Sequence, residues 1–78
     1  MVSHEGIVRR SGSIQAPTQF GLYSKDTGKL INYLYSSTPQ LEMSKYYGRH
    51  IIVSGEEGLD KRWLNTPVLT IQKIYVVQ

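Results

Sequence analysis

Apolar and polar residues alternate over short runs along this chain, a pattern typical of β-strands that bury one face. Gly, Pro and Ser residues separate the runs, as expected for turns. Between the third and fourth runs, Thr38 and Pro39 are residue types that start a helix, and Gly48 is a type that ends one. We therefore predict a short helix over residues 39–47. The five predicted strands are residues 5–10, 19–23, 30–35, 49–54 and 67–77.

Two connections and one irregularity follow from the same pattern. Residues 24–29 are predicted to form a hairpin turn, because Asp26 favours turns and Gly28 adopts a positive φ without strain. Residues 56–66 are mostly polar and are predicted to form a long connection before the last strand. Within that strand the alternation shifts by one residue near Gln72, which indicates a β-bulge.

The length of 78 residues allows one domain at most. We assign residues 5–77 to a single domain and residues 1–4 to a disordered or appended N-terminus. The chain has no Cys, so neither disulfides nor thiolate–metal sites support the core. Closing the sheet into a barrel suits so short a chain, because a barrel leaves no open strand edge.

The chain carries no segment of the type that enters or crosses a membrane. No run approaches the roughly 20 apolar residues that span a bilayer. Residues 1–5 lack the basic and apolar regions of a signal peptide. We therefore expect no membrane span, and the sequence does not distinguish a cytoplasmic location from the cell envelope.

The order of three strands, a short helix and two more strands resembles the OB-fold. The residues that carry the resemblance are Leu41, Tyr46, Gly48, the β-branched run to Val53, Gly55 and the run 67–74. The resemblance covers about residues 5–75 and implies an all-β, five-stranded Greek-key barrel of the OB type with one short α-helix between strands 3 and 4. An SH3-like barrel is the alternative, and it would not need that helix.

More narrowly, the chain is similar to small OB-like domains of uncharacterised bacterial proteins, some of which carry SH3-like or envelope modules. The matching segments are Arg9 and Arg10, residues 16–17, 33–36, 58–63 and 66–69. This resemblance implies a module within a larger bacterial protein and carries no catalytic residue over to this chain. Fold alone does not define an activity.

Catalytic, metal and cofactor sites have little support in the sequence. His4 and His50 are the only imidazoles, and neither belongs to a nucleophile motif. Glu56, Glu57 and Asp60 are close together, but their spacing is not that of a calcium loop. We read them as a solvated loop and expect no catalytic residue, no metal and no cofactor.

A binding face has more support. OB-folds that bind single-stranded nucleic acid use strands 2 and 3 and stack bases on aromatic rings, each contributing about 1–3 kcal/mol. The candidate ligand or partner face here consists of Tyr23, Tyr33, Tyr35, Lys25, Lys29, Arg9, Arg10, Arg62 and Trp63. The same residues also suit a purely structural role, because Tyr is common in half-buried strands and the arginines can pair with carboxylates. The net charge of +3 is a mild bias toward anionic partners.

The single Trp leaves two interpretations open. Trp63 is either an exposed contact residue or, with Leu59 and Leu64, a lid over one end of the barrel. We expect a non-catalytic binding or accessory module that mediates protein interaction or structural support within a larger bacterial protein. Its partner would be a protein or a neighbouring domain. The alternative function is single-stranded nucleic-acid binding at the tyrosine face.

Overall fold

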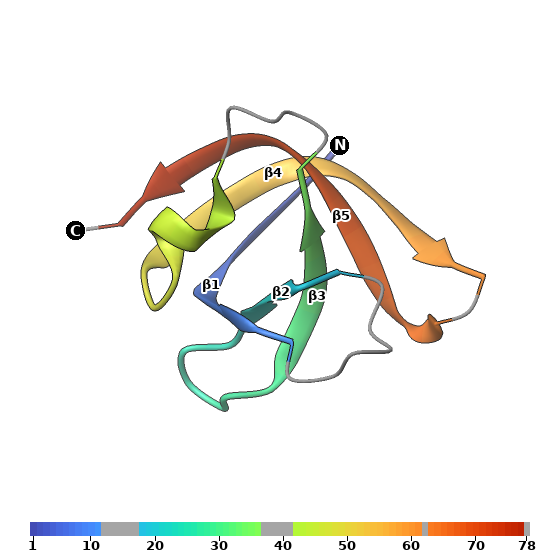
Figure 1. The fold of residues 1–78 in the computed structure, drawn as a ribbon, viewed down its shortest axis with the longest axis horizontal. Coiled ribbons are helices and arrows are strands. Elements are labelled where there is room, and N and C mark those ends of the chain that lie inside the picture. The colour runs from blue at the N-terminus through green and yellow to red at the C-terminus, as the bar shows by residue number, and fades with distance from the viewer. Residues whose placement is uncertain (12–17, 37–41, 62, 78) are drawn as a thin grey trace.

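The computed structural model describes residues 1–11, 18–36, 42–61 and 63–77, with residues 63 and 64 described by their backbone alone. It is an all-β structure in which five strands close into a barrel in the order β1-β2-β3-β5-β4, which confirms the predicted fold class (Figure 1). The elements are β1 (Val2–Arg10), β2 (Phe20–Tyr23), β3 (Leu30–Tyr35), η1 (Met43–Tyr46), β4 (His50–Asp60) and β5 (Trp63–Val76).

One long strand, β1, joins the two halves of the barrel. It pairs antiparallel with β2 from Ile7 onward and antiparallel with β4 from Val2 to Ile7. The barrel closes where β3 and β5 run parallel over residues 33–35 and 68–70. Residues 2–4, which we expected to lie outside the domain, are therefore strand residues paired with β4. The pairing of β1 with β4 extends back to Val2, whose partner is Gly55.

The described part of the predicted helix is a single 3₁₀ turn over Met43–Tyr46, so the prediction of an α-helix over residues 39–47 was wrong for these residues. Residues 37–41, which include the expected capping residues, lie outside the described part of the chain. Glu42 precedes the turn with an extended backbone and makes no side-chain cap, while Gly48 adopts φ +77° and ends it. So short a segment makes the tighter i→i+3 bonds in place of an α-helical ladder.

This turn is nevertheless joined to the barrel. The N–H of Gly48 donates to the carbonyl oxygen of Val8 at 2.7 Å, and the N–H of Val8 donates to the carbonyl oxygen of Arg49 at 3.1 Å. Met43 is buried in the main core cluster. The segment therefore contributes a side chain to the core.

The core lies between the inner faces of the strands. Ile51 and Val53, two positions apart on one face of β4, are both fully buried. The bulge predicted near Gln72 is confirmed, because Ser54 pairs with Lys73 while Gly55 pairs with Ile71. The buried apolar residues of the core cluster are Val8, Leu22, Leu34, Met43, Ile51, Val53, Leu69 and Ile71.

The prediction of a long polar connection over residues 56–66 was also wrong. Strand β4 continues to Asp60, and β5 begins at Trp63. Both faces of this extension are close to water, so it needs no apolar alternation to remain a strand pair. We call the extension the β4–β5 arm, defined as residues 56–60 of β4 and residues 63–67 of β5. In Figure 1 the end of β4 and the start of β5 lie on the opposite side of the molecule from the C-terminus.

Candidate functional site: an acidic hollow beside the β4–β5 arm

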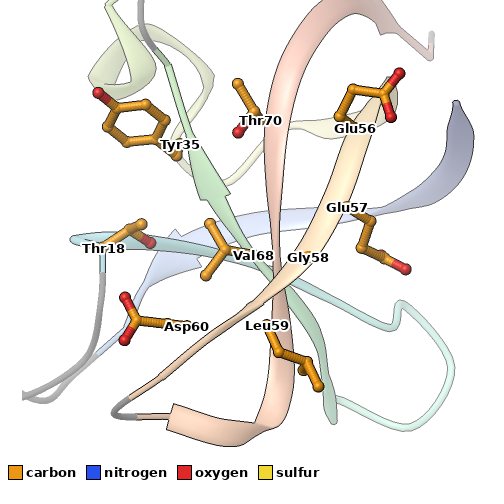
Figure 2. Close-up of a pocket in the computed structure, with 9 residues that line it drawn as sticks. All are labelled: Thr18, Tyr35, Glu56, Glu57, Gly58, Leu59, Asp60, Val68 and Thr70. Carbon is orange, nitrogen blue, oxygen red and sulfur yellow. The ribbon is translucent and has the colours of Figure 1, made fainter.

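A hollow of about 500 Å³ opens where the β4–β5 arm leaves the barrel. Strand β4 contributes one wall, β5 the floor, and the end of β3 with residue 18 the opposite wall (Figure 2). We call it the acidic hollow. Its lining residues are Thr18, Tyr35, Glu56, Glu57, Gly58, Leu59, Asp60, Val68 and Thr70.

The pairing register decides which side chains reach the hollow. Tyr35 pairs with Thr70, and Thr70 pairs with Glu56, so these three residues lie on the outer face of adjacent strands. Glu57 and Leu59 occupy the alternate positions of β4, and their side chains project away from Tyr35 (Figure 2). The hollow therefore presents hydroxyl groups and an aromatic ring beside outward-facing carboxylates.

The charge of the hollow is strongly local. Three of the six acidic residues of the chain, Glu56, Glu57 and Asp60, fall within five consecutive positions. Glu56 meets the terminal ammonium of Met1 at 3.8 Å, a distance at the outer limit of an ion pair, and both groups are well exposed. Tyr35 is 49% exposed, and Gly58 between the acidic residues has open space where a side chain would be. This arrangement attracts a cation and leaves room for a chain to lie across it.

A polar contact at the base of the arm joins three strands. The Oε2 of Glu57 accepts a hydrogen bond from Asn32 Nδ2 at 3.1 Å and contacts His4 Nε2, on the exposed side, at 2.9 Å. Asn32 is fully buried, and its Oδ1 has no hydrogen-bond partner among the described residues. We call these three residues the interior bridge, because they join β1, β3 and β4.

The predicted tyrosine face divides into residues with different surroundings. Tyr33 is only 4% exposed, Tyr23 is half-buried, and Tyr35 is exposed in the acidic hollow. Burial and the neighbouring Tyr33 raise the pKa of Tyr23, and Arg9 lowers it. Tyr23, Tyr33 and Arg9 are therefore neighbours, whereas Tyr35 belongs with the carboxylates.

The basic residues of the predicted face are also divided. Arg9 and Arg10 are exposed but occupy alternate positions of β1, so their side chains leave opposite faces of the strand. Arg10 lies over the ring of Phe20 at 5.8 Å, and Arg9 accompanies Tyr23. Lys25 and Lys29 are exposed in the turn between β2 and β3. Arg62 and the side chain of Trp63 lie outside the described part of the chain, so the choice between lid and contact residue stays open.

The second imidazole faces a smaller polar hollow. His50 Nε2 contacts Glu5 Oε2 at 2.6 Å, and both residues line a hollow of about 370 Å³ that also contains Ser24 and Asp26. The hydroxyl of Ser24 accepts a hydrogen bond from the N–H of Thr27. The contacts of His50 and Ser24 are thus a cross-strand pair and a turn, in place of a nucleophile bonded to a base.

Sequence reasoning missed the residues that form the acidic hollow, apart from Tyr35. It assigned Glu56, Glu57 and Asp60 to a solvated loop and gave no role to Thr18, Val68 or Thr70. The signal that was present is the concentration of acidic residues in a chain with a positive net charge. Their grouping with Tyr35 depends on the β3–β5 pairing, which joins residues 35 positions apart.

No model of a known protein family, no curated protein and no solved structure matches this chain. Among the described residues, no helix has the length and apolar character required to cross a membrane.

Proposed function

We propose that this chain is a non-catalytic binding module of the OB type within a larger bacterial protein, and that it holds a positively charged segment of a protein partner or neighbouring domain. The observation that carries the proposal is the acidic hollow. It combines exposed carboxylates, an exposed tyrosine and an apolar floor at Val68 on the outside of a closed barrel. Concave sites with a few convergent polar groups are the usual location of ligands.

Electrostatics favour a cationic partner over nucleic acid at this site. A phosphate backbone at the exposed ring of Tyr35 would lie beside Glu56 and Asp60, which also line the hollow. Like charges brought together at an interface cost several kcal/mol and reject the wrong partner. A Lys or Arg side chain meets the opposite situation, and it can also contact the aromatic ring at a gain of about 0.5–1 kcal/mol.

The proposal is tested with two labelled ten-residue peptides, one alternating Lys and Val and one alternating Glu and Val. Fluorescence anisotropy at low ionic strength should show binding of the Lys peptide alone. Glu56→Gln should weaken that binding by a factor of about 1.4 to 5, because an exposed ion pair contributes about 0.2–1 kcal/mol. Glu42→Gln is the matched control, since Glu42 is exposed and lies outside the hollow. Equal binding of both peptides, or an equal effect of the two substitutions, contradicts the proposal.

Single-stranded nucleic acid remains the second candidate, supported by the proximity of Arg9 to Tyr23 on the outer face of β1 and β2. Only one ring of this pair of tyrosines is accessible, because Tyr33 is buried. Labelled oligo-dT and oligo-U in low salt test the candidate. Binding that falls steeply with salt and is lost in Arg9→Gln would favour it, whereas no anisotropy change at tens of micromolar protein would remove it.

A further inference from the structure

The side chains that line the acidic hollow lie on two sides of β5 (Figure 2). On the side of the Tyr35 ring lie the side chains of Thr18, Val68, Thr70 and Asp60. Glu56, Glu57 and Leu59 lie on the other side. The part of the hollow beside Tyr35 is therefore bounded by an aromatic ring, the carboxylate of Asp60, two hydroxyl groups and an apolar side chain.

The ring of Tyr35 is accessible to a ligand in this part of the hollow. Tyr35 is the last residue of β3 and is 49% exposed. Its pairing partner on β5 is Thr70, and Val68 lies on the same face of β5, about 7 Å away along the strand. The face of an aromatic ring carries negative partial charge, so a cation held over the ring is attracted to it.

The polar groups near the ring can accept hydrogen bonds from a ligand. The hydroxyl of Thr18 donates its proton to the carbonyl oxygen of Phe20 at 2.7 Å, so its oxygen can only accept from a ligand. The carboxylate of Asp60 has about four acceptor sites on its two oxygens, so it can take a bidentate donor in addition to other contacts. Thr18 and Asp60 therefore favour a ligand that carries several N–H groups.

An arginine side chain matches these groups better than a lysine side chain does. A guanidinium is planar, carries five N–H donors and binds a carboxylate in a bidentate fork, while one of its faces can stack on an aromatic ring. A lysine ammonium is compact and strongly hydrated, so it gives up more hydration for each contact that it makes. The apolar stem of either side chain can lie over Val68, which lines the hollow. The difference between the two therefore arises at Tyr35 and Asp60.

We propose that the acidic hollow recognises an arginine side chain of the partner segment. The guanidinium lies against the ring of Tyr35 and donates to the carboxylate of Asp60, and the stem lies over Val68. This inference rests on the proposed function and adds the basic residue that is selected and the two side chains that select it. The order of preference is arginine over lysine, and lysine over a neutral side chain of the same shape as arginine.

The test uses the intact chain and three labelled ten-residue peptides that alternate Val with Arg, Lys or citrulline, a neutral isostere of arginine. Fluorescence anisotropy at low ionic strength should show the Arg peptide binding about three- to tenfold more tightly than the Lys peptide, and no binding of the citrulline peptide. Tyr35→Leu should reduce that preference to less than about twofold, because the stacking contact is lost. Tyr75→Leu is the matched control and should leave the preference unchanged, since Tyr75 is 69% exposed and lies outside the hollow. Asp60→Asn should weaken the Arg peptide more than the Lys peptide, because the bidentate fork is lost.

The outcomes separate this inference from the proposed function. If the Arg and Lys peptides bind equally to the native chain, or if Tyr35→Leu leaves the preference unchanged, recognition of arginine by the ring is refuted while binding of a basic segment stands. If Asp60→Asn weakens both peptides equally, the assignment of the fork to Asp60 is overturned. If the citrulline peptide binds as tightly as the Arg peptide, or if none of the three peptides binds, both proposals fail.

Discussion

Replacing Asn32 with Asp tests the interior bridge, because it places a second carboxyl where the amide now contacts Glu57. The amide nitrogen lies 3.1 Å from Glu57 Oε2, and Asn32 is fully buried. Two charges at that separation repel by about 5 kcal/mol at an effective dielectric constant of 20. The introduced carboxyl avoids this cost by binding a proton, and its O–H then donates to Glu57 as the amide did.

Protonation sets the size of the effect. Holding an aspartic acid neutral at pH 7 against its unfolded pKa of about 3.9 costs about 4 kcal/mol, at 1.36 kcal/mol per pH unit. The folded-state pKa of the introduced group is raised, so the native state binds more protons than the unfolded state between pH 4 and pH 7. The penalty of Asn32→Asp should therefore be about 4 kcal/mol at pH 7 and nearly vanish at pH 4.

Urea denaturation of the native chain and the variant at pH 7, 6, 5 and 4 measures this difference, and Asn65→Asp on the exposed part of β5 is the control. Combining Asn32→Asp with Glu57→Gln should recover at least half of the loss at pH 7. A difference below 1 kcal/mol at pH 7, or one that does not change with pH, would refute the interior bridge.

Two further predictions concern the close approach of β4 and β5 at Gly55 and the pKa of Tyr23. Gly55→Ala should destabilise the chain by about 1–3 kcal/mol in thermal melts, because a Cβ there would overlap the Thr70 carbonyl oxygen. Gly58→Ala is the control and should have little effect, because the space around Gly58 is open. Equal melting temperatures of the two variants would contradict the close approach of β4 and β5. Since burial and Tyr33 raise the pKa of Tyr23 and Arg9 lowers it, Arg9→Gln should raise it further. Absorbance at 295 nm measures phenolate formation, and comparison with Tyr23→Phe identifies the part of the titration that belongs to Tyr23. Because the folded-state pKa of Tyr23 is raised, its ionisation should account for part of the stability that the chain loses above pH 10.

The strands were largely predictable because each has a local cause. In β4 the β-branched residues from Ile51 to Val53 were sufficient to predict a strand, and Ile51 and Val53 on one of its faces are buried. Turn chemistry was similarly local, and Gly28 and Gly48 both adopt the positive φ expected of them. These features depend on neighbours a few residues apart, which a sequence displays directly.

The predictions were wrong or incomplete where contacts between residues far apart in the sequence determine the local structure. Pro39 and the residues up to Tyr47 have helix-starting and helix-ending signals, yet the described part of this segment is one 3₁₀ turn attached to Val8. Residues 56–60 have no apolar alternation, but hydrogen bonding to β5 makes them a strand. In β3, Tyr33 and Tyr35 share one face of the strand, so alternation alone could not indicate that Tyr33 is buried while Tyr35 is exposed beside the hollow.

The net charge of +3 suggested an anionic partner, but the relevant quantity is the charge felt at each surface. Residues 56–60 carry three negative charges, so positive groups outnumber negative ones by six over the rest of the chain. The molecule measures 35 × 28 × 23 Å, and charges in physiological salt are screened over about 8 Å. A ligand in the acidic hollow is therefore governed by the three carboxylates that line it, so a basic segment is attracted there although the chain as a whole is positive.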